Sequence, residues 1–77
     1  MNQDILHKSY ALKKSARQSF NFRGHTALGG WETTEVRGKI TAVLTCKVCG
    51  KAVYIDTNPA PNGIDIGGEA VALGCED

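Results

Sequence analysis

The stretch TCKVCGKAV, residues 45–53, is the part of the sequence that decides how the chain folds. Cys46 and Cys49 stand three positions apart, so both thiolates can reach one ion if the chain between them forms a tight knuckle. Gly50 follows at once and accepts the positive φ angle that such a knuckle commonly needs. The backbone N–H groups of the knuckle can then point at the two sulfurs. A structural zinc site takes four nitrogen or sulfur ligands in a tetrahedron, so this pair supplies half of one.

The residues on either side of the cysteine pair read as β-strands. Residues 33–45 are rich in β-branched side chains and predict one long strand, or two short ones divided at Gly38. Residues 51–57 predict the next strand, which places the cysteine pair at the tip of a hairpin. A redox function of the pair would need a βαβ context and a helix starting at the motif, so the flanking strands favour metal binding.

Residues 3–22 predict a helix, with Asn2 as a plausible N-cap and Asp4 in the first turn. Gly24 is well placed to end the helix in a left-handed conformation. One face of the helix collects Ile5, Ser9, Leu12, Ala16 and Phe20. Another face collects His7, Tyr10, Lys14 and Arg17. The first face should pack on the hairpin, which leaves the second facing outward.

The remaining segments read as connections and short elements. Residues 26–32 look like a connection, and Asn62-Gly63 is a strong turn signal. Residues 64–66 alternate and predict a short third strand, after which Gly67-Gly68 should bend the chain. Residues 69–73 fit one helical turn closed by glycine, with a fourth short strand as the alternative. The predicted fold class is a small α+β domain: an N-terminal helix packed on a metal-stapled short antiparallel sheet.

The short length of the chain favours a fold that is stabilised by disulfides or by a metal ion. Seventy-seven residues make at most one domain, and a core of that size rarely supplies more than about 3–5 kcal/mol of stability. Three cysteines are too few, and an odd number, for a secreted disulfide scaffold. The sequence shows no apolar run of signal-peptide or membrane-spanning length. We therefore expect a cytoplasmic protein with reduced thiols, a single domain over residues 1–77, and no membrane partner.

The other metal ligands have to come from distant parts of the chain. Cys75 is the natural third ligand, since the predicted turn and the glycine pair bring the chain back to the hairpin. His25, at the end of the helix, is the expected fourth; Glu76, Asp77, water or a partner chain are the alternatives. His7 lies among basic residues and is expected to be a solvated surface histidine. The sequence thus predicts one structural zinc ion held by Cys46, Cys49, Cys75 and His25.

These pieces resemble the zinc-ribbon group of small zinc-finger proteins, and also short zinc-ribbon-like proteins of prokaryotes and their phages. The resemblance is carried by Arg23-Gly24-His25, by Cys46-Lys47-Val48-Cys49-Gly50, and by Gly67-Gly68-Glu69-Ala70 before Cys75. A usual ribbon has two Cys-x-x-Cys knuckles, whereas Cys75 and His25 stand here in place of the second. The resemblance implies a zinc-ribbon-like part over residues 26–77, a structural zinc, and no established activity.

Two functions fit the sequence, and a third is not expected. The first is a protein-interaction or adaptor module, using the apolar stretch 64–73; Trp31 is expected in the core, or as an exposed anchor. The second is nucleic-acid binding, because residues 1–25 carry a balance of +4 while residues 26–77 carry −3. The candidate contact residues on the helix are Lys13, Lys14, Arg17 and Tyr10. An enzyme acting on a small molecule is not expected, because three thiolates make zinc a poor Lewis acid and no general base stands beside the motif.

Overall fold

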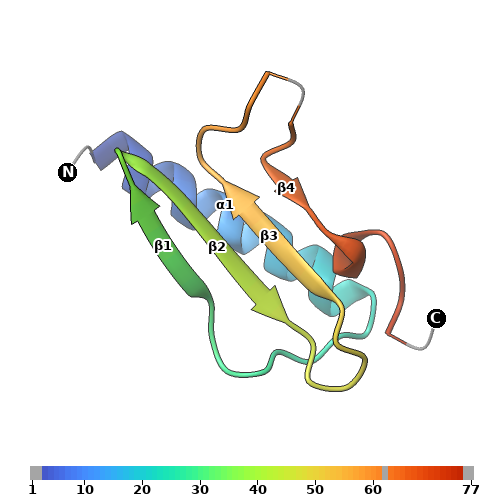
Figure 1. Cartoon of the computed structure of the whole chain (residues 1–77). Helices are drawn as coiled ribbons and strands as arrows, with labels where there is room; N and C mark the ends of the chain where they lie inside the picture. The colour runs from blue at the N-terminus through green and yellow to red at the C-terminus, as the bar shows by residue number, and fades with distance from the viewer. Residues whose placement is uncertain (1–2, 62, 76–77) are drawn as a thin grey trace.

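The chain folds into one helix layer and one sheet layer. The computed structural model describes residues 3–61 and 63–75. In chain order the elements are α1 (Gln3–Phe22), β1 (Glu32–Val36), β2 (Lys39–Thr45), β3 (Ala52–Asp56), β4 (Ile66–Gly67) and the short 3-10 helix η1 (Glu69–Val71). The strands form an antiparallel sheet in the order β1-β2-β3-β4, and α1 runs along one face of it (Figure 1). The predicted α+β class is confirmed.

The core lies between α1 and the two central strands. The strand residues alternate, so one side chain in two on β2 and β3 points toward the helix. The buried residues of this layer are Leu12, Ala16 and Phe20 from α1, Ile40, Ala42 and Leu44 from β2, Val53 and Ile55 from β3, and Ala70 from η1. Trp31 is half-buried and packs against this cluster, as expected for a core tryptophan. Burial of the predicted helix stripe is what fixes α1 across the sheet.

A two-residue turn divides the long β-branched segment into β1 and β2. Arg37 and Gly38 have φ angles of 54° and 76°, the left-handed pair that a tight hairpin turn needs. Residues 32–36 pair in register with residues 39–43 of β2. The alternative of two short strands divided at Gly38 is therefore the correct one, and β1 lies at the edge of the sheet with all its side chains exposed.

The fourth strand is shifted from its predicted place. The sequence predicts the strand after the cysteine hairpin over residues 64–66. In the structure this strand is β4, Ile66–Gly67, and Gly67 pairs with Tyr54. A Cβ on Gly67 would lie 2.5 Å from the Tyr54 hydroxyl oxygen, so a larger residue here would have to displace the Tyr54 ring. The bend comes one residue later at Gly68, where φ is 108° and a Cβ would lie 2.3 Å from the Ala52 carbonyl oxygen. The helical turn expected over residues 69–73 is present as η1.

Thr57 extends the pairing of β2 and β3 beyond the end of β3. Its N–H donates to the Ile40 carbonyl at 3.0 Å, and its hydroxyl oxygen accepts the Ile40 N–H at 2.9 Å. Both residues are buried, so this side chain satisfies a backbone donor that water does not reach.

Asp56 anchors the start of the loop that follows β3. Although its burial opposes ionisation, the Asn58 N–H and the Lys39 ammonium, which lie 2.9 and 3.0 Å from its carboxylate oxygens, lower the pKa of Asp56 below 3.8. The more distant Lys8 contributes in the same direction. The carboxylate is therefore held ionised at the far end of the sheet from the cysteine knuckle.

Candidate metal centre

The knuckle between β2 and β3 is fixed by its own backbone. The Cys46 N–H donates to the Lys51 carbonyl at 2.8 Å, and the Gly50 N–H donates to the Cys46 carbonyl at 3.1 Å. Gly50 has a φ angle of 79°, as the sequence predicted for the residue after the second cysteine. The connection after the helix lies alongside, because the Lys47 N–H donates to the Thr26 carbonyl at 2.9 Å. The turn therefore presents two thiols to the same side of the chain.

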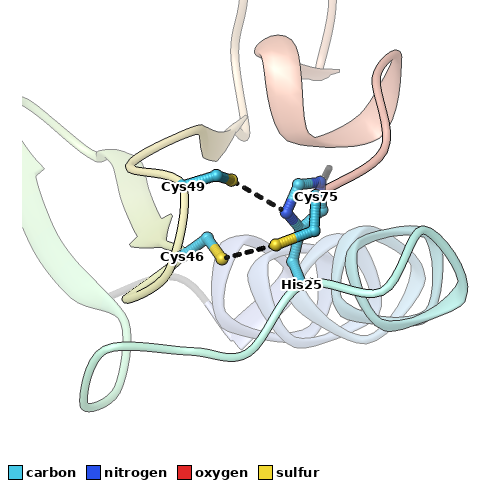
Figure 2. A group of neighbouring side chains, drawn as sticks. All are labelled: His25, Cys46, Cys49 and Cys75. Atoms are coloured by element: carbon cyan, nitrogen blue, oxygen red, sulfur yellow. Dashed lines mark hydrogen bonds between the residues drawn. The ribbon is translucent and has the colours of Figure 1, made fainter. Parts of the chain in front are cut away.

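The end of α1 brings the other two candidate ligands to the knuckle. Gly24 takes a φ angle of 85°, as predicted, and the His25 N–H then donates to the Phe20 carbonyl at 3.2 Å. The Cys75 N–H donates to the Arg23 carbonyl at 3.1 Å, which ties the C-terminal segment to the helix end. In Figure 2 the side chains from the helix end, the knuckle and the C-terminal segment all point toward one another.

The four predicted ligands form one group that could hold a metal ion. The ligand atoms of His25, Cys46, Cys49 and Cys75 all lie within 4.8 Å of one another. The Cys46 and Cys75 sulfurs are 3.7 Å apart, and the Cys49 sulfur is 3.4 Å from His25 Nδ1. Zinc–sulfur bonds of about 2.3 Å and zinc–nitrogen bonds of about 2.0 Å at tetrahedral angles place two sulfurs about 3.8 Å apart and a sulfur and a nitrogen about 3.5 Å apart. These two edges thus have the dimensions of a zinc tetrahedron.

A backbone carbonyl orients the imidazole of His25. The His25 Nε2 atom lies 2.9 Å from the Leu73 carbonyl oxygen, which can only accept, so Nε2 carries the proton. In the neutral ring Nδ1 then keeps its lone pair, and Nδ1 is the atom that faces the thiols. The ring is 4% exposed and packs on Phe20, with 5.1 Å between ring centroids. This pattern, one ring nitrogen fixed by an outer partner and the other free to bind, is typical of metal-ligating histidines.

The thiols differ in their affinity for protons. Burial by itself raises the pKa of Cys46, but the backbone N–H groups of Cys49, Thr26 and Val48 outweigh it and lower that pKa from 9.0 to about 5. The Val48 N–H lies 3.4 Å from the Cys46 sulfur. Burial, followed by the neighbouring sulfurs of Cys46 and Cys49, raises the pKa of Cys75 to about 11. The surroundings therefore favour loss of the proton from Cys46 before Cys75.

The other histidine of the sequence lies away from this group. His7 is exposed on α1, as predicted. Glu76 and Asp77, the alternative fourth ligands, lie outside the described residues. The Leu73 carbonyl and the Thr26 N–H were missed, because backbone groups that meet across the fold leave no residue-type signal in the sequence.

The candidate contact residues of α1 divide into two kinds. Tyr10, Lys14 and Arg17 are exposed. Lys13 is half-buried, and its ammonium donates to the Thr33 hydroxyl of β1 at 3.0 Å. Lys13 therefore ties the helix to the edge strand, and the exposed basic stripe begins beyond it.

Comparisons with other proteins add no family. A scan against protein-family models, a search of curated proteins and a search of solved structures each found no match. Among the described residues, no helix is both long and apolar enough to span a bilayer. What characterises the chain is therefore its α+β fold and a buried three-cysteine, one-histidine group that could bind a metal ion.

Proposed function

We propose that this protein is a small, non-catalytic zinc-binding module that acts as a protein-interaction, or adaptor, domain. The observation that carries the proposal is the convergence of three sulfurs and one oriented imidazole nitrogen within 4.8 Å. Thiolate and imidazole donors in a tetrahedral arrangement select zinc over the harder cations that prefer oxygen ligands. The short edges of 3.7 and 3.4 Å agree with a zinc ion at the centre.

The burial of the group supports a structural role for the metal rather than a catalytic one. Cys46 is 1% exposed and His25 is 4% exposed, and Cys49 and Cys75 are half-buried. Four protein ligands fill a zinc tetrahedron, so no position is left for water or a substrate. The metal would join the helix end, the knuckle and the C-terminal segment, adding to the backbone and side-chain hydrogen bonds between them. Zinc binding and folding are then one equilibrium, with roughly 10–16 kcal/mol of apparent binding free energy.

Zinc content and folding test this part of the proposal together. Untagged protein should contain one zinc per chain by elemental analysis, and excess chelator should abolish its native circular dichroism and amide NMR dispersion. Cys46→Ser and Cys75→Ser should each lose zinc and unfold, whereas Ser19→Ala, on the exposed side of α1, should do neither. A chain that stays folded after its metal has been stripped would refute the structural role.

Exposed apolar side chains beside the ligands support the adaptor role. Phe22, Leu28, Val48 and Leu73 are 87%, 63%, 69% and 41% exposed. Each stands within three residues of a candidate ligand, so the metal would gather them at one end of the molecule. We call these four residues the apolar collar. The segments 22–31, 45–51 and 71–75 contain no acidic residue, while Lys47 adds a positive charge. The partner that fits the collar is a peptide segment with apolar residues flanked by acidic ones.

A matched pair of substitutions tests the collar. The probe is a labelled synthetic peptide of leucine and phenylalanine interspersed with glutamate, and the control probe carries lysine in place of glutamate. Val48→Ser should weaken binding of the acidic peptide about tenfold with zinc content unchanged. Val36→Ser, at an exposed position (56%) at the opposite end of the sheet, should not weaken it. Equal affinity of the two variants, or equal affinity for both probes, would contradict the adaptor proposal and leave the zinc proposal intact.

A further inference from the structure

The charges of this protein are divided between its two layers. Residues 5–31, which include α1 after its first two residues, contain no aspartate or glutamate. The acidic residues that the structure describes after α1 belong to the sheet layer and its connections: Glu32, Glu35, Asp56, Asp65 and Glu69. The helix covers one face of the sheet (Figure 1), and after Asp4 in its first turn it carries cations but no further acidic residue.

Two exposed cations in the middle of α1, Lys14 and Arg17, are not engaged by the described part of the fold. Lys13 donates to Thr33, and the Arg23 guanidinium donates to the Val71 carbonyl at 2.9 Å. Lys14 and Arg17 are exposed and make no hydrogen bond or ion pair with the residues described in this structure. The fold thus uses the cations at the margins of the helix and leaves those in the middle of its outer face to solvent.

We propose that the outer face of α1 binds the phosphate backbone of a nucleic acid. The contact residues are His7, Tyr10, Lys14 and Arg17, which we call the cationic stripe. Their spacing of three, four and three residues places them along one side of the helix over about 15 Å. Phosphates follow one another at about 3.4 Å along each strand of a duplex, so about four of them fall within this length. Lys14, Arg17 and His7 can then make two or three phosphate contacts.

The composition of the stripe favours a nucleic acid over an acidic protein. A protein partner that packs on a helix face needs apolar side chains to bury. None of the four stripe residues is aliphatic, and the neighbouring Ala11 offers only a methyl group. The exposed apolar side chains of the collar belong to other positions of the chain. Tyr10, 61% exposed, is the one aromatic ring among the cations, and an exposed ring can stack on a base or a sugar. This proposal does not depend on the collar, and it would give the module a second, chemically different surface.

Salt-dependent binding of a defined probe tests the stripe. Zinc-loaded protein is titrated into fluorescein-labelled 20-nucleotide mixed-sequence DNA, as a single strand and as a duplex, from low to moderate salt. Two to three phosphate contacts predict a slope of log affinity against log salt of about −2 to −3 for the duplex, and a slightly smaller slope for the single strand. Absence of binding to either probe at low salt would overturn the proposal.

Charge-matched variants distinguish binding at the stripe from attraction to the net charge of the protein. Lys14→Glu/Arg17→Glu should abolish binding. In single variants of equal charge, Lys14→Glu should weaken binding, whereas Arg37→Glu, in the turn between β1 and β2, should keep the native salt slope. If both single variants lose DNA affinity equally while they keep zinc and native circular dichroism, the attraction is non-specific and the proposed role of the stripe is wrong.

Two final arms identify the ligand class. Tyr10→Ala should weaken single-strand binding about tenfold, because base stacking on the ring is lost, and should leave the salt slope unchanged. Polyglutamate of equal charge should displace the DNA poorly. If polyglutamate competes as well as unlabelled DNA and Tyr10→Ala has no effect, the stripe binds acidic protein and the nucleic-acid proposal is wrong.

Discussion

Replacing His25 with alanine is the sharpest perturbation of the proposed centre. The substitution removes the one nitrogen donor and leaves three sulfurs in place. It also removes the ring that packs on Phe20 and the N–H that donates to the Leu73 carbonyl. His7→Ala is the matched control, because His7 lies exposed on the same helix and away from the metal group.

The size of the effect follows from the number of ligands. If four ligands share roughly 10–16 kcal/mol, one of them contributes about 3 kcal/mol. Because 1.4 kcal/mol corresponds to a factor of ten, the zinc affinity of His25→Ala should fall about 100-fold. His25→Cys should recover most of that loss, since a thiolate from this position restores four protein ligands.

Competition with a chromophoric zinc chelator measures these affinities at fixed pH. Cobalt substitution gives a second readout, because the visible bands of tetrahedral cobalt report on the ligand set. His25→Ala and His25→Cys should each change those bands, and His7→Ala should reproduce the native spectrum. A His25→Ala protein that binds zinc within threefold of the native affinity would show that the fourth ligand is not His25.

The remaining predictions concern the scaffold. Gly68→Ala should destabilise the zinc-loaded protein by about 3–5 kcal/mol in urea unfolding, because its Cβ would meet the Ala52 carbonyl at 2.3 Å in a left-handed conformation; a loss below about 1 kcal/mol would contradict this reasoning. Thr57→Val should cost about 1–3 kcal/mol, since it leaves the buried Ile40 N–H without its acceptor, whereas Thr57→Ser should cost less. Asp56 has a lowered pKa in the folded protein, so its contribution to stability is present above pH 4 and is lost as pH falls below it. The stability difference between native protein and Asp56→Asn should therefore shrink on acidification from pH 5, and a constant difference would disprove that contribution.

Local signals in the sequence predicted the helix, the hairpins and the residues of the metal group. The spacing of Leu12, Ala16 and Phe20 defines a helix face that needs no knowledge of the rest of the fold. Gly24 and Gly50 mark left-handed positions in the same way, and both have positive φ angles. Cys75 and His25 were chosen as ligands because few other donors exist in the sequence, and the structure brings both to the knuckle.

The features that were missed depend on contacts between distant parts of the chain. The strand at Ile66–Gly67 was displaced because its place is set by the Tyr54 ring on β3, which sequence spacing does not reveal. The spacing of Lys13 predicts that it belongs to the exposed basic surface, but its ammonium contacts Thr33, 20 residues away in the sequence. The orientation of His25 by the Leu73 carbonyl joins positions 48 residues apart. Periodicity predicts which residues share a face, and it does not predict which backbone group meets a side chain.

The direction of β3 has a practical consequence for protein engineering. β3 starts next to the cysteine knuckle and ends at Asp56, so the connection from β3 to β4 leaves the sheet at the end opposite the metal group (Figure 1). Lengthening a surface loop costs only about 0.6 kcal/mol for each doubling of its length. An epitope or a fluorescent reporter inserted near Ala60 would thus be carried far from both the collar and the metal ligands. If zinc binding and folding are coupled as proposed, foreign peptides inserted at this position would be displayed on a scaffold that folds only when zinc is supplied.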